Sequence, residues 1–135
     1  MTKSNKLFLG LFLIYLLLVA YCCFWNFDSM PAVNQTMFGI PTDKIVHFIM
    51  FFPFPILCYM AFERGWSKAW QILLGVLATA LLGLAVAAST EIIQSFTPYR
   101  NGDFKDFRAD ALAIVISSVI IFAITLFKTR KASRT

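Results

Sequence analysis

Residues 91–110 have the sequence Glu91-Ile-Ile-Gln-Ser-Phe-Thr-Pro-Tyr-Arg-Asn-Gly-Asp-Phe-Lys-Asp-Phe-Arg-Ala-Asp110 and lie between two long apolar runs. Neither the run before them, residues 72–90, nor the run after them, residues 111–127, contains a charged residue. A helix of about 20 apolar residues crosses the ~30 Å hydrocarbon core of a bilayer, since each residue adds about 1.5 Å. The two runs therefore predict two membrane-spanning helices, with the polar segment 91–110 at one membrane surface.

The composition agrees with a membrane protein. Of the 135 residues, 59% are apolar and 14% are charged, whereas soluble domains have about 45–50% apolar and about 25% charged residues. The net charge is +5, but a nucleic-acid-binding protein clusters its basic residues on a soluble face. Here they flank apolar segments, so we expect no nucleic-acid partner and predict an all-α, single-domain integral membrane protein over residues 1–135.

The apolar segments predict a polytopic bundle of four transmembrane helices. We expect these helices at about 7–27, 44–62, 69–95 and 107–127, followed by a solvated basic tail at 128–135. The first segment could instead be a cleaved signal peptide, because a basic start and an apolar run define one. We disfavour that alternative because the run is long and ends in bulky aromatic residues in place of a small-residue cleavage site.

Two features mark the start and the middle of the second helix. Thr42 offers an N-cap, and Asp43 places a negative charge where the helix dipole favours it. Pro53 and Pro55 lie within the apolar segment, so we expect a kink near its middle.

The third helix carries small residues at every fourth position, which lets helix backbones approach closely in lipid. The row consists of Gly75, Thr79, Gly83 and Ala87, and at the same spacing it leads to the ionisable Glu91 and then Ser95. The three cysteines, Cys22, Cys23 and Cys58, have no metal-ligand spacing, so we expect them to pack as apolar residues. A disulfide between Cys22 and Cys58 is excluded if four helices span the membrane, because the two residues then lie near opposite surfaces.

The distribution of basic residues predicts the orientation. Eight lysines and arginines lie in the two terminal segments and the 63–68 turn, and the other four lie at the opposite ends of the helices. The positive-inside rule then places both termini in the cytoplasm. The start of the second helix, the end of the third and segment 100–110 meet at the outer face.

This topology gathers a set of polar residues that we predict to form a ligand-binding site. The set is Asp43, Lys44, His47, Glu91, Gln94, Arg100, Asp103, Asp106 and Asp110. His47 is either a polar residue satisfied inside the bundle or a proton carrier or ligand, since histidine titrates near neutral pH. Glu91 is a functional candidate because ionisable residues in spanning segments are costly; the alternative is a structural ion pair with Arg100 or Lys44.

Asp103, Asp106 and Asp110 follow i, i+3, i+7 spacing and share one helical face. Oxygen-rich sites of this kind suit Mg²⁺ or Ca²⁺. Lys105 and Arg108 are interleaved, however, and can neutralise the carboxylates. We therefore expect no cofactor, with Mg²⁺ or Ca²⁺ on these aspartates as the alternative.

The polar positions together resemble the VanZ-like membrane proteins. The matching pattern is Asp43-Lys44-x-x-His47, then Glu91-x-x-Gln94, then Arg100-x-x-Asp103-x-x-Asp106-x-x-x-Asp110. It covers roughly residues 43–113, while the hydropathy agrees over the whole chain. The family usually has Asn, followed three residues later by Gly, where this chain has Asp110 and Ala113. The resemblance implies a small multi-pass protein of the bacterial plasma membrane, whose namesake confers resistance to the glycopeptide antibiotic teicoplanin.

Three functions are compatible with these residues. The first is binding of an envelope lipid headgroup or an amphipathic glycopeptide at the outer leaflet, with Lys44, Gln94 and Arg100 contacting anionic or amide groups. The second is an enzyme that acts on a lipid-linked envelope precursor, with His47 or Glu91 as general acid or base and a divalent ion on the aspartates. Proton-coupled transport ranks last, because the apolar runs offer few polar residues below the surface. The sequence gives neither the ligand nor the oligomeric state.

Overall fold

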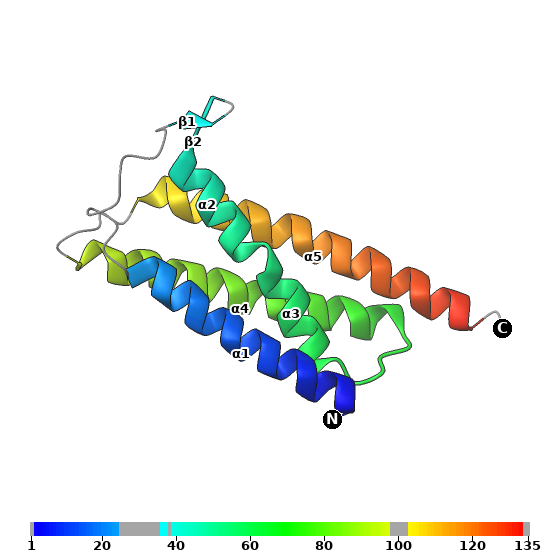
Figure 1. Ribbon diagram of the computed structural model, residues 1–135. Coiled ribbons are helices and arrows are strands. Elements are labelled where there is room, and N and C mark those ends of the chain that lie inside the picture. The colour runs from blue at the N-terminus through cyan, green and yellow to red at the C-terminus, as the bar shows by residue number, and fades with distance from the viewer. Residues whose placement is uncertain (1, 25–35, 38, 98–102, 134–135) are drawn as a thin grey trace.

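The computed structural model describes residues 2–24, 36–37, 39–97 and 103–133, and it is helical apart from one small hairpin (Figure 1). The helices are α1 Lys3–Phe24, α2 Thr42–Phe51, α3 Pro53–Phe62, α4 Ala69–Ser95 and α5 Phe104–Ala132. Because α2 and α3 form one apolar segment, Thr42–Phe62, the described residues contain four helical segments long and apolar enough to span a membrane. The predicted all-α class and the four spanning segments are confirmed.

The helices run side by side, so that segments far apart in the sequence meet at the same end of the bundle. In Figure 1 the end of α1, the start of α2, the end of α4 and the start of α5 lie at one end, and both chain termini lie towards the other. α5 packs against both α4 and α2, and α1 packs against α3. The predicted meeting of the polar segments at one end of the bundle is therefore confirmed.

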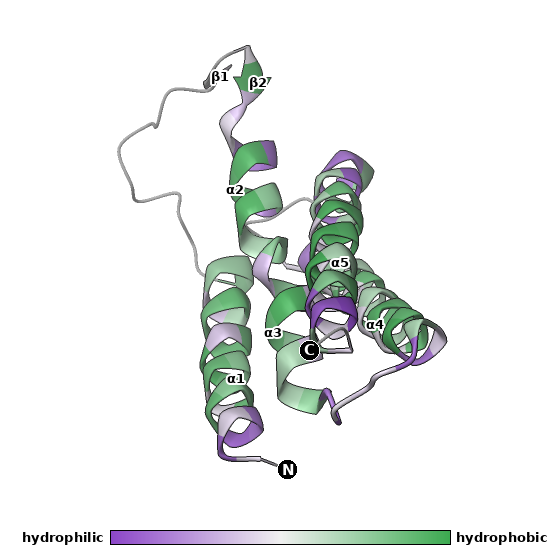
Figure 2. Ribbon diagram, turned by 90° about the vertical axis from the view of Figure 1, so that its right-hand side faces the viewer, coloured by the Kyte–Doolittle hydropathy of each residue, from purple (hydrophilic) through white to green (hydrophobic). Residues whose placement is uncertain are grey.

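The outward faces of the helices are apolar, which is how a bundle presents itself to lipid. Leu17, Leu81 and Val119 are 72%, 67% and 62% exposed. Figure 2 shows that hydrophobic residues cover most of each helix, whereas the hydrophilic residues lie mainly near the helix ends. Soluble monomers rarely expose so many large apolar side chains, because their contact with water is unfavourable, whereas the lipid chains of a bilayer would cover them.

The interior is built on the small residues of α4, as the fourfold spacing predicted. Gly75, Thr79, Gly83 and Ala87 are all buried, and the backbone at Gly83 lies directly against Phe54 and Ile114. Close approach of helices through small residues provides the van der Waals contact that holds transmembrane bundles together. The row continues into Glu91, which is also buried.

The predicted kink is confirmed and lies at Phe52, between α2 and α3. Pro53 is the first residue of α3, where a missing N–H is tolerated. The Tyr15 hydroxyl of α1 donates a 2.6 Å hydrogen bond to the Met50 carbonyl beside the break. A neighbouring helix thus satisfies a backbone acceptor where the helix is interrupted, as an apolar environment requires.

The other end of this segment is also held by a side chain of α1. Asn5 is buried, and its Nδ2 donates to the carbonyls of Met60 and Glu63 at 3.1 and 2.9 Å. These carbonyls lie at the C-terminal end of α3, where helices leave acceptors without internal partners. No sequence pattern marks Asn5 or Tyr15, yet the hydrogen bonds of both side chains join α1 to the α2–α3 segment.

Three local predictions were wrong or imprecise. Thr42 is the first residue of α2 and not its N-cap, because Pro41 occupies that position without a side-chain hydrogen bond. α5 extends to Ala132, so most of the basic segment predicted as a solvated tail is helical. Lys and Arg in the last turn favour such an extension, since they interact well with the carbonyl end of the helix dipole. The α1 and α5 helices also begin earlier than predicted.

A short antiparallel hairpin precedes α2. It pairs β1, Thr36–Met37, with β2, Ile40–Pro41. Gly39 in its turn has φ +78°, a conformation that glycine adopts without steric cost. The three cysteines all lie in the described residues, and none forms a disulfide.

Gly83→Leu is expected to lower the free energy of unfolding by at least about 1–3 kcal/mol, the usual cost of overpacking. A Cβ at this position would lie 3.0 Å from a Phe54 ring atom and 3.3 Å from Ile114, so a larger side chain must push α4 away from α3 and α5. Gly10→Leu is the matched control, because a Cβ there has no heavy atom within 4 Å. Thermal and SDS-induced unfolding of both variants in detergent micelles measures the difference; equal stability of the two variants would contradict the packing described here.

Candidate functional site

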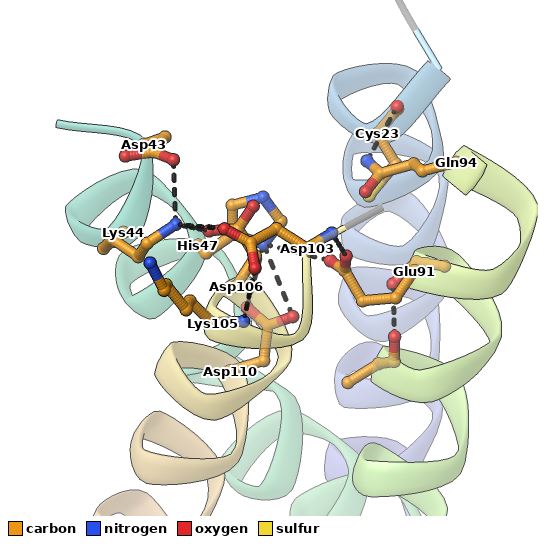
Figure 3. Close-up of polar contacts among 12 residues, drawn as sticks. Cys23, Asp43, Lys44, His47, Glu91, Gln94, Asp103, Lys105, Asp106 and Asp110 are labelled. Atoms are coloured by element: carbon orange, nitrogen blue, oxygen red, sulfur yellow. Dashed lines mark hydrogen bonds and ion pairs between the residues drawn. The ribbon is translucent and has the colours of Figure 1, made fainter. Parts of the chain in front are cut away.

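The polar residues at the α2 end of the bundle form one connected cluster (Figure 3). α2 contributes Asp43, Lys44 and His47 from its first two turns, and α4 contributes Glu91 near its end. The residue before α5 and the first turns of that helix contribute the aspartates. Segments more than forty residues apart in the sequence thus supply a single site.

Lys44 contacts three carboxylates, and two of them, Asp103 and Asp106, join α2 to the start of α5. Its Nζ lies 3.0 Å from Asp43 Oδ2 and 3.4 Å from Asp103 Oδ2, and it also contacts Asp106 Oδ1. The Lys44 and Asp106 side chains are only 17% and 11% exposed. Solvent therefore screens the Lys44–Asp106 contact poorly, and this contact holds the start of α5 against α2 more firmly than a surface ion pair would.

His47 lies deeper in the bundle and pairs with Asp110. Its Nδ1 is 3.1 Å from Asp110 Oδ1 and 3.4 Å from Oδ2, while Asp110 is completely buried. In the neutral tautomer with a proton on Nδ1, the ring donates this hydrogen bond and Nε2 keeps its lone pair. Glu91 Oε1 lies 3.7 Å from the same Nδ1. Histidine therefore sits between two carboxylates from different helices.

Glu91 and Asp103 fix the start of α5. Glu91 Oε2 accepts a 3.0 Å hydrogen bond from the Asp103 backbone N–H. Asp103 is the N-cap of α5, and its Oδ1 accepts from the Lys105 backbone N–H at 2.9 Å. This hydrogen bond, together with the Lys44 ammonium, holds the pKa of the Asp103 carboxyl below its usual value.

The cluster carries an excess of negative charge in a buried position. It contains five carboxylates and one lysine, so with His47 neutral and the carboxylates ionised the excess is four negative charges. Four of the residues in the cluster, His47, Glu91, Asp106 and Asp110, are at most 9% exposed. Buried charges in an apolar environment require a partner, a proton or a bound cation.

A groove opens beside this cluster, between the end of α4 and the start of α5. Its volume is about 340 Å³. Its lining combines the carboxylates of Glu91 and Asp103 with mostly apolar side chains, namely Ala88, Ile92, Ser95, Phe104 and Phe107. Ile92 and Phe104 are 59% and 72% exposed, so the apolar part faces the surroundings of the bundle.

The profile of the VanZ/LLP1 family matches residues 12–128, which is nearly the whole chain. This chain belongs to the VanZ/LLP1 family. The match confirms the resemblance to VanZ-like proteins that was based on the pattern of polar residues. It also agrees with a multi-pass membrane protein, since the matched region includes most of all four spanning segments.

A relative of this VanZ/LLP1 protein comes from the fission yeast Schizosaccharomyces pombe and is described as an uncharacterized protein. The two are 28% identical over 116 residues, which covers 86% of this chain and 63% of the yeast protein. The chain therefore spans somewhat less than two thirds of that relative's length. No solved structure matches this chain.

Not all of the predicted site residues of this VanZ/LLP1 protein lie in the cluster. Seven of them contact one another in the cluster, but Gln94 turns towards α1, where its Nε2 donates a 3.0 Å hydrogen bond to the Cys23 carbonyl. Gln94 is 3% exposed and fastens α1 to α4. Arg100, the remaining predicted residue, lies outside the described residues.

The sequence pattern did not predict which residues of the site contact one another. His47 and Asp110 are separated by 63 residues, and no spacing rule shows that they are partners. Lys44 was predicted to contact a ligand, whereas in this VanZ/LLP1 protein it contacts three carboxylates. Its position one turn before His47 was the available signal, because both then face the same neighbouring helix.

The arrangement offers two kinds of chemistry. The excess carboxylates can bind a cation, either a metal ion or a positively charged group of a ligand. The His47–Asp110 pair can accept a proton on the free ring nitrogen, as in general base catalysis. Glu91 links the cluster to the groove between α4 and α5, because it lines the groove and lies beside His47.

Proposed function

We propose that this VanZ/LLP1 protein binds the polar headgroup of a membrane lipid or lipid-linked amphiphile at the acidic end of its bundle. The observation that carries the proposal is the groove between α4 and α5, whose lining includes both the carboxylates of Glu91 and Asp103 and the exposed ring of Phe104. An amphiphile needs this combination, with an apolar wall for its chain and polar groups for its headgroup.

The charge of the cluster restricts the headgroup chemistry. Lys44 is already surrounded by three carboxylates, and the cluster as a whole is negative. A bare anionic headgroup would therefore be repelled. The bound headgroup must bring a positive charge, as an amine does, or carry its phosphate on a divalent cation.

The relative in a yeast favours a lipid over a glycopeptide as the ligand. Phospholipid headgroups are present in the membranes of all cells, so related proteins in distant organisms can share such a ligand. Teicoplanin resistance remains part of the proposal, because an amphipathic glycopeptide also combines an apolar chain with a polar group and could bind in the same groove. The proposed setting is the bacterial plasma membrane, with the acidic cluster on the outer face.

The distribution of basic residues supports this orientation. Lys3, Lys6 and the basic end of α5 lie towards the end of the bundle opposite the acidic cluster, and cytoplasmic ends of membrane proteins are enriched in such residues. A cysteine placed at Lys105 should react with an impermeant maleimide in intact cells, while one at Lys128 should not. The opposite pattern would reverse the orientation.

Headgroup binding is tested by native mass spectrometry of the purified protein released from mixed micelles. The wild type should retain phosphatidylethanolamine, or phosphatidylglycerol together with a divalent cation, and Glu91→Gln should reduce retention at least about fivefold. Glu63→Gln is the matched control, since it makes the same chemical change at the opposite end of the bundle. Equal retention by the wild type and Glu91→Gln, for every lipid, would show that the groove is not a headgroup site.

The His47–Asp110 hydrogen bond favours a second candidate, an enzyme that hydrolyses a lipid-linked envelope precursor. A carboxylate that orients a histidine is a recurring arrangement for proton abstraction from water or a hydroxyl. Purified protein with Mn²⁺ should then release phosphate from an isoprenyl diphosphate, and His47→Gln should abolish the release. Wild-type protein that shows no turnover over hours would eliminate this candidate and leave the binding function unaffected.

A further inference from the structure

One buried oxygen in the cluster has no hydrogen-bond partner in the part of the chain that the structure describes. The Glu91 side chain is 10% exposed, and its Oε1 makes no hydrogen bond among the described residues. Oε2 of the same carboxylate is satisfied by the Asp103 N–H, so Oε1 is the atom left over. A buried carboxylate oxygen without a partner costs free energy, and an unmet acceptor of this kind indicates a ligand.

Glu91 Oε1 is directed towards His47 Nδ1, at 3.7 Å. Ligand atoms of His47, Glu91 and Asp106 all lie within 4.8 Å of one another, and all three residues are buried. They come from α2, α4 and α5, so the fold itself brings them to one point (Figure 3). We propose that His47, Glu91 and Asp106 bind one divalent metal ion.

The charge balance supports an ion at this point. Lys44 neutralises one of the five carboxylates of the cluster, and a doubly charged ion would neutralise two more. Without a cation the carboxylates of Glu91, Asp106 and Asp110 repel one another in a poorly solvated interior. An ion bound between three helices would therefore also hold α2, α4 and α5 together.

The ligand types select the class of metal. One imidazole nitrogen with two carboxylate oxygens suits Mn²⁺, Zn²⁺ or Fe²⁺, whereas Mg²⁺ and Ca²⁺ prefer oxygen ligands alone. The site thus differs from the Mg²⁺ or Ca²⁺ site on Asp103, Asp106 and Asp110 that the sequence offered as an alternative to no cofactor. Asp103 is engaged as the helix N-cap. Asp110 contacts His47 Nδ1, so with this hydrogen bond in place the ion would bind Nε2, and Asp110 would orient the ring as carboxylates commonly do beside a metal-binding histidine.

This inference deepens the proposed function, and its use in ligand binding rests on that function. Glu91 lines the groove as well as the proposed metal site. An ion held there would place a positive charge where the phosphate of a headgroup could reach it. An acidic site could then bind an anionic lipid.

The test is a Mn²⁺ titration of the purified protein in detergent, monitored by electron paramagnetic resonance of the free ion, with no polyhistidine tag. We expect one ion per chain, displaced by Zn²⁺. Because His47 is the chain's only histidine, the spin-echo signal of bound Mn²⁺ should show nitrogen coupling from a single imidazole, and His47→Gln should remove it.

Glu91→Gln and Asp106→Asn should each weaken Mn²⁺ binding at least about tenfold. Glu63→Gln, the same change at the opposite end of the bundle, should leave it unchanged. Asp43→Asn is the charge control, because Asp43 contacts Lys44 and is more exposed than Asp106; it should weaken binding less than threefold. Elution volume and circular dichroism establish that each variant is folded.

Absence of stoichiometric Mn²⁺ binding, or bound Mn²⁺ without nitrogen coupling, would overturn the proposal. Equal weakening by Asp43→Asn and Asp106→Asn would do the same, since it would reduce the site to diffuse charge. If the ligand variants fail to fold, the nitrogen coupling in the wild type decides. Lipid retention measured with and without Mn²⁺ separates the two proposals: retention that is independent of Mn²⁺ leaves headgroup binding intact, and Mn²⁺ binding without any lipid retention leaves the metal site intact.

Discussion

Lys44→Met is expected to lower the free energy of unfolding by about 3–5 kcal/mol, the usual cost of breaking a buried ion pair by removing one partner. The substitution keeps the length of the side chain but leaves three carboxylates without their shared cation. The most affected is Asp106, whose side chain is 11% exposed. Removing Lys44 should therefore separate the start of α5 from α2.

The measurement is reversible unfolding in mixed micelles, with EDTA present so that no metal ion replaces the lost charge. Lys105→Met is the matched control, because it makes the same chemical change at the exposed residue next to Asp106. We expect the control to lie within about 0.5 kcal/mol of the wild type. If Lys44→Met were as stable as the control, the Lys44 network would contribute nothing to the fold.

His47→Leu is expected to cost about 3 kcal/mol, because it leaves Asp110 as a fully buried carboxylate without its hydrogen-bond donor. The double variant His47→Leu/Asp110→Leu should recover to within about 1 kcal/mol of the wild type. Replacing both members of a buried polar pair by apolar residues removes the unmet charge together with its partner.

Unfolding of the two single variants and the double variant forms a double-mutant cycle for the pair. A coupling free energy above about 1 kcal/mol would establish that His47 and Asp110 stabilise each other. A double variant no more stable than His47→Leu would show that His47 acts through packing alone. The same variants, titrated with Mn²⁺, connect the stability of the pair to the proposed metal site.

Much of the fold follows from local sequence features. The four spanning segments follow from the length and continuity of the apolar runs, since a bilayer imposes its own thickness. The break at Phe52 follows from Pro53 and Pro55, because proline lacks the N–H that continues a helix. Helix ends were less predictable, as α5 shows, because its last turns are governed by weak interactions of basic residues with terminal carbonyls.

The candidate site followed from the sequence only as a list of residues. Hydropathy placed Asp43, His47, Glu91 and the aspartates at the same end of the bundle, and that placement is confirmed. Hydropathy did not predict which of these residues contact each other, because contacts between side chains of three helices depend on how each helix is rotated and tilted. Gln94 illustrates the difference: it lies three residues from Glu91 but hydrogen-bonds to α1, on another face of α4.

The sequence by itself determined that this chain is a four-span VanZ-like membrane protein with most of its acidic residues at one end. The length of an apolar run and the position of a charge can both be read along the chain, and the thickness of the bilayer then fixes which segments span it. The tertiary structure decided which groups meet: Lys44 with three carboxylates, His47 with Asp110, and Glu91 Oε1 near His47 but without a hydrogen-bond partner among the described residues. These contacts depend on the rotation of packed helices about their axes, which is set by the fit of small residues such as Gly83 against Phe54 and Ile114.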